Sequence, residues 1–267
     1  MRVVAYFLVG YGVMVGLAYL MQQRMTYFPE RQSLPDLKSQ AATAGLHLWP
    51  SDDADYLGVT GANDLVGSNG TIVVFHGNAG AAVHRFYYAQ ALERLGYRVV
   101  VAEYPGYGAR PGRPGEKAFV AAAGQLVQKV HGRFAQPIYL WGESLGCGVA
   151  TAVAAQSPVP IAGVILVTPW NSLSQLAQKL YWYLPARWLV RERYDNVANL
   201  AQYPGPVAVV MAGNDEIVPP SLSEALYEAL SNPKEKWVFA GAGHNTWPAG
   251  PEEAWWREVM TFMAGEQ

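Results

Sequence analysis

The sequence G-E-S-L-G at residues 142–146 constrains the fold of this chain more than any other feature. An apolar run over residues 137–141 predicts a short buried strand before it, and the small and apolar residues of 145–155 predict a helix directly after it. A G-x-S-x-G sequence between a strand and a helix is typical of a sharp turn that strains the serine backbone and exposes its hydroxyl. A side chain in place of either glycine would collide with the neighbouring strand or helix. The helix N-terminus adds free N–H groups and a positive potential beside Ser144.

Strands and helices alternate along the chain from residue 70 onward. Apolar and β-branched runs predict strands at 71–75, 97–102, 137–141, 161–167, 206–211 and 237–240. Helices are predicted between and after them, at 82–95, 116–131, 145–155, 221–230 and 252–263. This alternation predicts a parallel sheet with helices on both faces. In such a sheet a site forms at the carboxyl ends of the strands.

Three chemically reactive side chains follow predicted strands at that edge. Ser144 follows the strand at 137–141, Asp215 follows 206–211, and His244 follows 237–240. Serine, acid, histidine is the chain order of one lineage of catalytic triads. We therefore expect His244 to take the proton of Ser144 and Asp215 to orient the imidazole. Glu216 remains the alternative acid, and helix capping the alternative role for Asp215.

A tetrahedral oxyanion also needs hydrogen-bond donors pointed at it. The backbone N–H of Leu145, the residue after the serine, is the first candidate. The second is the backbone N–H of Asn78, in the loop that follows the strand at 71–75, with Ala79 as the alternative. We expect His76 to hold this loop in place rather than to take part in catalysis.

The N-terminus carries a candidate membrane span. Val3 to Met21 contains 19 residues without a charge, and nine of them are Val, Leu or Phe. As a helix this run would be about 28 Å long, close to the thickness of a bilayer core. A cleaved signal peptide is the alternative, but no small-x-small cleavage site follows the run. We therefore predict that residues 3–21 anchor the chain in a membrane as a single pass.

The orientation of this anchor is less constrained. Arg24, Arg31 and Lys38 follow the span, whereas Arg2 and the amino terminus precede it. Counting positive charges would leave the catalytic part on the cytoplasmic side, but by a small margin. The side of the membrane therefore stays open.

Composition excludes other classes of function. The formal net charge is −2 and only 15% of the residues are charged, so no basic surface is available for nucleic acid. The five histidines lack the close spacing of metal ligands, and we expect neither a metal nor another cofactor. Cys147 is the only cysteine, which excludes an intramolecular disulfide and favours a packing role.

Several motifs together carry a resemblance to a known family. They are R-M-T-Y-F-P at 24–29, H-G-N-A-G at 76–80, Y-P-G-Y-G at 104–108, G-E-S-L-G at 142–146, T-P-W at 168–170 and G-H-N at 243–245. With them the chain resembles serine hydrolases of the α/β-hydrolase superfamily, and more narrowly the membrane-anchored Bem46-like proteins. The resemblance implies an α/β-hydrolase fold, with a mostly parallel sheet flanked by helices, a small helical lid and an N-terminal transmembrane helix. The stretch between residues 52 and 70 matches least well.

These residue patterns also predict a domain organisation. Residues 1–21 form the anchor, 22–52 a juxtamembrane connection, and 53–267 the hydrolase domain. Residues 171–200, which we call the insertion, interrupt the alternation with crowded Leu, Tyr and Trp side chains. A lid over the site and a helical segment packed on the core are equally compatible with this pattern.

The expected activity is that of a membrane-anchored serine hydrolase that cleaves a carboxylic ester or thioester through an acyl-serine intermediate. Its partners would be a small-molecule or acylated substrate and the membrane, with the oligomeric state left open. A serine peptidase of the same fold and a non-catalytic membrane scaffold are the alternatives. A dehalogenase is disfavoured because Ser144 stands where the nucleophilic aspartate would be.

Overall fold

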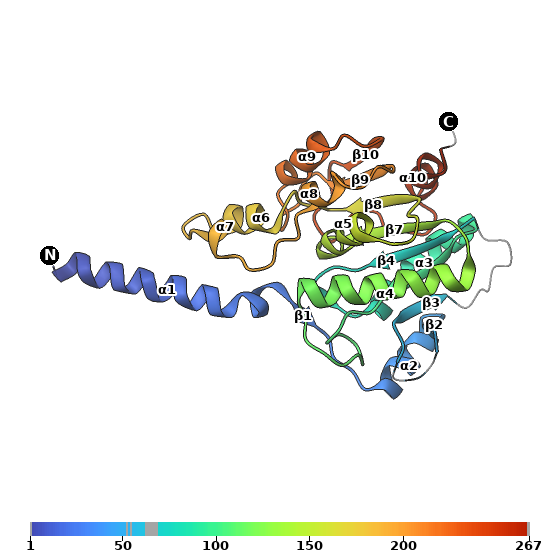
Figure 1. Cartoon of the computed structure of the whole chain (residues 1–267), viewed down its shortest axis with the longest axis horizontal. Helices are drawn as coiled ribbons and strands as arrows, with labels where there is room; N and C mark the ends of the chain where they lie inside the picture. Colours follow the sequence, from blue (N-terminus) through green and yellow to red (C-terminus); the bar gives the residue numbers. More distant parts are fainter. Residues whose placement is uncertain (1, 52, 54, 62–68, 266–267) are drawn as a thin grey trace.

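The computed structural model describes residues 2–51, 53, 55–61 and 69–265, which form an eight-stranded sheet between two layers of helices (Figure 1). The strand order is β10-β9-β8-β7-β4-β6-β3-β2. Every pair from β10 to β6 is parallel, whereas β3 runs antiparallel to both β6 and β2. The predicted mostly parallel sheet is therefore confirmed. The strands are β2 (Leu46–Trp49), β3 (Gly58–Gly61), β4 (Thr71–Phe75), β6 (Arg98–Ala102), β7 (Ile138–Glu143), β8 (Gly163–Val167), β9 (Val207–Ala212) and β10 (Lys234–Phe239).

Alternation of side chains along the central strands creates a hydrophobic core on each face of the sheet. In β4, Val73 and Phe75 point into one core, and Ile72 and Val74 into the other. The first core is covered by α4 (Glu116–Phe134), α5 (Leu145–Gln156), α8 (Asn196–Leu200) and α9 (Pro220–Ala229). The second is covered by α2 (Leu34–Thr43), η1 (Ala82–Arg85), α3 (Phe86–Leu92) and α10 (Trp255–Ala264), with the short helix η2 (Glu93–Leu95) after α3.

The sheet begins earlier in the chain than the sequence predicted. Residues 22–52 were expected to be a juxtamembrane connection, but β2 within them is an edge strand of the main sheet. The reason is tertiary: Leu46 and Leu48 are buried in the same core as Leu37 of α2, which a four-residue strand does not reveal by its own pattern. The first residue of the predicted anchor, and residues 62–68 of the weakly matching stretch, lie outside the described residues.

The N-terminal helix α1 (Arg2–Thr26) extends away from the sheet (Figure 1). None of its described residues is buried, and it is long and apolar enough to cross a membrane, a property that a signal sequence would share. After it, β1 (Phe28–Pro29) pairs in parallel with β5 (Ala79–Gly80). The insertion contains α6 (Leu173–Leu180), α7 (Ala186–Leu189) and α8.

Candidate active site

Ser144 occupies a strained turn between β7 and α5. Its φ of 52° and ψ of −113° place a non-glycine residue in a region that L-amino acids rarely adopt. The turn is also tightly packed. A Cβ built on Gly146 would lie 1.8 Å from the carbonyl oxygen of Phe75, and one on Gly142 would lie 2.5 Å from Cα of Cys147. Both glycines are therefore required, as expected, for the helix to pass close to the sheet.

The three predicted catalytic side chains form one hydrogen-bonded chain. The Nε2 of His244 lies 2.9 Å from Oγ of Ser144. The Nδ1 of the same ring lies 2.7 Å from Oδ2 of Asp215. All three residues are buried, which shields these contacts from bulk water. This is the arrangement in which a histidine can act as a base toward a serine.

The two neighbouring acids, Asp215 and Glu216, make different contacts. While Oδ2 of Asp215 faces the imidazole, its Oδ1 accepts the backbone N–H groups of Ile217 and Val218 at 2.9 and 2.7 Å. Glu216 instead accepts the backbone N–H of His244 at 3.1 Å. Asp215 therefore combines a turn-capping contact with the contact to the ring, and Glu216 supports the loop.

The expected oxyanion donors lie beside Ser144. Leu145 is the first residue of α5, so its N–H has no partner within the helix. Asn78 and Leu145 line the same cavity as Ser144 and His244. The carbonyl of Asn78 accepts the N–H of Phe28 at 2.9 Å and the hydroxyl of Tyr107 at 2.6 Å. These contacts fix the peptide between Asn78 and Ala79, and Ala79 is the register partner of Phe28 in the β1–β5 ladder.

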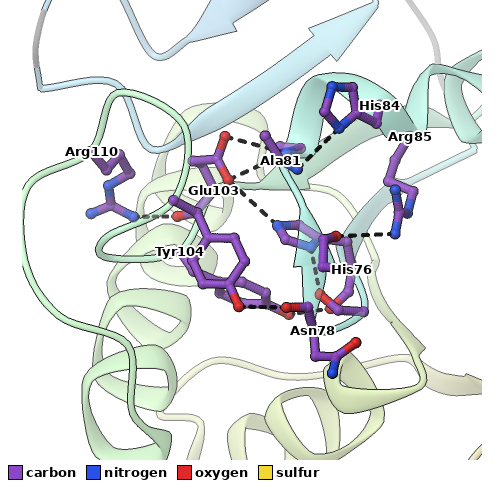
Figure 2. A network of polar contacts seen from close by, with 12 residues as sticks. His76, Asn78, Ala81, His84, Arg85, Glu103, Tyr104 and Arg110 are labelled. Atoms are coloured by element: carbon purple, nitrogen blue, oxygen red, sulfur yellow. Dashed lines mark hydrogen bonds and ion pairs between the residues drawn. The ribbon is translucent and has the colours of Figure 1, made fainter. Parts of the chain in front are cut away.

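A buried network holds the loop of Asn78 from behind (Figure 2). The Nε2 of His76 lies 3.4 Å from Oε1 of Glu103, and neither side chain is exposed. Glu103 also accepts the backbone N–H of Ala82 at 3.2 Å, and the hydroxyl of Tyr104 donates to the carbonyl of His76 at 2.8 Å. His76 thus connects the loop to the end of β6, in agreement with its expected structural role.

Glu143, immediately before the serine, belongs to a second buried cluster. Its carboxylate accepts hydrogen bonds from Arg85 at 3.1 Å, Tyr87 at 2.7 Å and Tyr88 at 2.9 Å. Burial alone would raise the pKa of the Glu143 carboxyl, but Arg85 and the two hydroxyls outweigh it and hold the pKa below its usual range. A fixed negative charge therefore lies behind the turn at Ser144.

The cavity above Ser144 has a volume of about 550 Å³ and reaches well beyond Ser144 and His244. Side chains of the insertion, among them Leu173 and Leu176 of α6, form one wall. The last turns of α1 form another wall. The part of the insertion that contains α6 and α7 thus borders the cavity, whereas α8 packs on the core. That the insertion acts as a lid stays a prediction.

Sequence reasoning missed several residues that support the site. The carboxylate of Glu103 is one, although its position directly after a predicted strand was a signal that could have identified it. Arg85 is another, because nothing in its own helix marks it as the partner of Glu143. Tyr27 also donates to the Glu192 carboxylate and lies 2.9 Å from the hydroxyl of Tyr194. Burial raises the pKa of Glu192.

Among the residues that the structure describes, no group of three or more His, Cys, Asp or Glu side chains is arranged to hold a metal ion. Cys147 is a buried free thiol on α5, and burial raises its pKa well above the usual value. The thiol therefore belongs to the packing of α5 rather than to the polar contacts of the site.

Comparison with known sequences gives relatives for most of the chain. A family model described as the alpha/beta hydrolase fold matches residues 70–202. An uncharacterized protein of Mycobacterium tuberculosis strain H37Rv is 35% identical over 228 residues, which cover 84% of this chain and 80% of that protein. Lysophosphatidylserine lipase ABHD12 of Danio rerio is 31% identical over 186 residues, 62% of this chain. These residues are 49% of the lipase, so the match spans about half of its length.

Solved structures share the architecture. The Pyrococcus furiosus esterase Pf2001 superposes with a TM-score of 0.64 at 19% identity, covering 90% of this chain and 97% of the esterase. The monoacylglycerol lipase of Paleococcus ferrophilus superposes with a TM-score of 0.53 at 22% identity, covering 74% of this chain and 95% of the lipase. At these identities the likeness shows the fold alone.

Proposed function

The chain belongs to the α/β-hydrolase superfamily, and from this premise we propose that it is a membrane-anchored serine hydrolase. Its reaction would be the cleavage of a carboxylic ester or thioester through an acyl-Ser144 intermediate. The names of the relatives and structural neighbours, which include lipases and esterases, favour an ester over an amide.

One observation carries the proposal: the unbroken hydrogen-bond chain from Asp215 through His244 to Ser144, at 2.7 and 2.9 Å. A serine hydroxyl is a weak nucleophile near neutral pH and requires an adjacent base. The imidazole is in hydrogen-bond range of the hydroxyl proton, and the carboxylate stabilises the imidazolium that forms. A chain that served only as a scaffold would have no need to bury these three groups in contact.

The reaction proceeds in two halves. His244 takes the proton of Ser144 as Oγ attacks the acyl carbon, and the oxyanion accepts hydrogen bonds from the N–H groups of Leu145 and Asn78. His244 then gives the proton to the leaving alcohol or thiol. A water molecule, deprotonated by His244 in turn, attacks the acyl carbon; as the bond to Oγ breaks, His244 returns the proton to Ser144 and the carboxylic acid leaves.

The position of α1 supports its retention as an anchor. Its C-terminal turn caps the oxyanion loop, because the side-chain amide of Asn78 donates to the carbonyl of Thr26 at 2.9 Å. Its last turns also form a wall of the catalytic cavity. Removal of α1 as a signal peptide would open this wall, whereas a retained helix keeps the cavity complete and tethers it to a membrane.

A fluorophosphonate probe tests the proposal, because it labels only activated serines. Wild-type protein in detergent should be labelled and should hydrolyse p-nitrophenyl butyrate. Ser144→Ala should lose both properties and keep its fold, while Ser221→Ala, on the surface of α9, should keep all of them. Labelling that persists in Ser144→Ala would overturn the assignment of the nucleophile. A folded wild-type protein that is neither labelled nor active would support the scaffold instead.

A further inference from the structure

Three hydrogen bonds join the insertion to α1, which lies far from it in the sequence. The hydroxyl of Tyr11 donates to the carbonyl of Tyr183 at 2.9 Å. The side chain of Gln22 donates to the carbonyl of Leu189 and accepts the N–H of Arg191, both at 3.0 Å. The guanidinium of Arg191 also lies 4.0 Å from the ring centre of Tyr19. The part of the insertion that contains α6 and α7 therefore lies along α1, as Figure 1 shows.

These contacts come from one stripe of α1. Tyr11 and Gln22 both bond the insertion, and Val15 and Ala18 between them are partly covered in a helix that is otherwise largely exposed. Spacings of four, three and four residues place these side chains on a single face of a helix. Tyr11 within the charge-free run, and Gln22 directly after it, thus turn polar groups toward the insertion.

In a membrane-spanning α1, the hydrogen bond from Tyr11 to the carbonyl of Tyr183 lies deep in the bilayer. Tyr11 lies near the middle of the charge-free run from Val3 to Met21. Met21 lies ten positions further along the chain, which corresponds to about 15 Å along the helix, or half of a bilayer core of about 30 Å. The carbonyl of Tyr183 therefore reaches the level of the hydrocarbon interior.

The backbone of the insertion tip (residues 180–189) suits such a place. Within hydrocarbon, backbone polar groups outside helices need partners from the protein. Gln178 donates to the carbonyl of Leu184 at 3.0 Å and accepts the N–H of Arg187 at 3.2 Å. Tyr11 and Gln22 of α1 cover two further carbonyls of the same segment.

The insertion tip exposes four large apolar or aromatic side chains. Trp182 is 78% exposed and Trp188 is 74% exposed, and they are accompanied by Leu180 and Tyr183. Exposed apolar patches of this size mark surfaces that contact a protein or a membrane. The guanidinium of Arg187 lies 4.4 Å from the ring centre of Trp188, a cation–π pair that partly satisfies the charge.

We propose that the insertion tip enters the bilayer beside α1, and that the groove between them receives the acyl chain of a substrate that resides in the membrane. The groove is continuous with the catalytic cavity and is apolar where it leaves the site. Its lining includes Ala18 and Met25 of α1 together with Leu176, Leu180 and Leu189 of the insertion. This inference rests on the proposed ester hydrolysis and adds that the substrate reaches Ser144 laterally, from within the bilayer.

The first test measures membrane insertion and does not depend on catalysis. Full-length Trp182→Cys is labelled with an environment-sensitive dye in vesicles whose lipids carry bromine in the middle of the acyl chains. Cys147 is buried and stays unlabelled. We expect strong quenching at position 182 and none in Val238→Cys, an exposed position on β10. Absence of quenching in both Trp182→Cys and Trp188→Cys would overturn the inference, even if the protein hydrolyses esters normally.

The second test measures occupancy of the groove. Ala18→Trp narrows it, whereas Leu17→Trp, on the exposed face of the same helix, is the matched control. Ala18→Trp should exclude about two methylene groups of the acyl chain from the groove. The ratio of the hydrolysis rate of vesicle-embedded p-nitrophenyl palmitate to that of p-nitrophenyl butyrate should therefore fall about tenfold. Leu17→Trp should keep the wild-type ratio. An unchanged ratio in Ala18→Trp, or the same loss in both variants, would overturn the groove. Failure of wild-type protein to cleave either ester would contradict the proposed function instead.

Discussion

Replacement of Asp215 by asparagine tests the catalytic contacts most directly, because the structure determines which way the new side chain must point. Oδ1 of Asp215 accepts two backbone N–H groups, from Ile217 and Val218. An asparagine would keep its oxygen on that side, since its NH2 group cannot accept them. The NH2 group would then face Nδ1 of His244, where Oδ2 now lies at 2.7 Å.

The consequence is a change of tautomer. An NH2 donor opposite Nδ1 requires that nitrogen to be unprotonated, so the proton moves to Nε2. Nε2 lies 2.9 Å from Oγ of Ser144 and would then donate to the hydroxyl rather than accept its proton. A triad with the wrong tautomer loses about 10⁴-fold in kcat, or roughly 5.4 kcal/mol of transition-state stabilisation.

The assay is the kcat for p-nitrophenyl butyrate, measured in detergent alongside a thermal unfolding midpoint that shows each variant is folded. Glu216→Gln is the matched control, and we expect a loss of less than about tenfold because its amide oxygen still accepts the N–H of His244. A folded Asp215→Asn variant that keeps kcat within about tenfold of wild type would refute the tautomer argument. A larger loss in Glu216→Gln than in Asp215→Asn would identify Glu216 as the acid.

Two further predictions concern stability. Gly146→Ala should lower the free energy of unfolding by at least about 1–3 kcal/mol, because its Cβ would overlap the Phe75 carbonyl. Gly124→Ala, in open space on α4, should not lower it. Equal thermal unfolding midpoints of the two variants would contradict this reasoning. The lowered pKa of Glu143 means that its ionised form stabilises the fold above the unfolded value of about 4.3 and that this stabilisation is lost as pH falls through the folded pKa. Denaturant titrations from neutral to acidic pH should therefore show a smaller acid-induced loss of stability in Glu143→Gln than in wild type, and parallel losses would argue against a charged Glu143.

Much of the central fold could be predicted from the sequence because its determinants are local. The β-branched run at 71–75 matches the bounds of β4, and the helix predicted at 145–155 matches α5 within one residue. The G-x-S-x-G turn was predictable for a similar reason, because the close packing of the turn requires glycine at two positions and the sequence has glycine at both. The short antiparallel strands β2 and β3 were much less predictable, because four residues carry too little periodicity.

The candidate site was predictable to a similar extent. Parallel strands bring their carboxyl ends to one edge, so a serine, an acid and a histidine after three such strands were expected to meet. The structure brings Ser144, Asp215 and His244 within hydrogen-bond distance, and their catalytic roles remain a proposal. The choice between the adjacent Asp215 and Glu216 depended on the direction of each side chain, which the sequence does not record.

The sequence by itself therefore determined the central β-strands, the tight turn at Ser144 and the apolar N-terminal helix, because each depends on residues adjacent in the chain. Only the tertiary structure decided that His76 faces Glu103, and that Tyr11 meets the carbonyl of Tyr183, 172 residues away. Such contacts arise when separately formed elements pack, and the geometry of packing depends on all the side chains at the interface together. For this reason an N-terminal segment that the sequence presents as an appendage forms, in the folded chain, a wall of the cavity above Ser144.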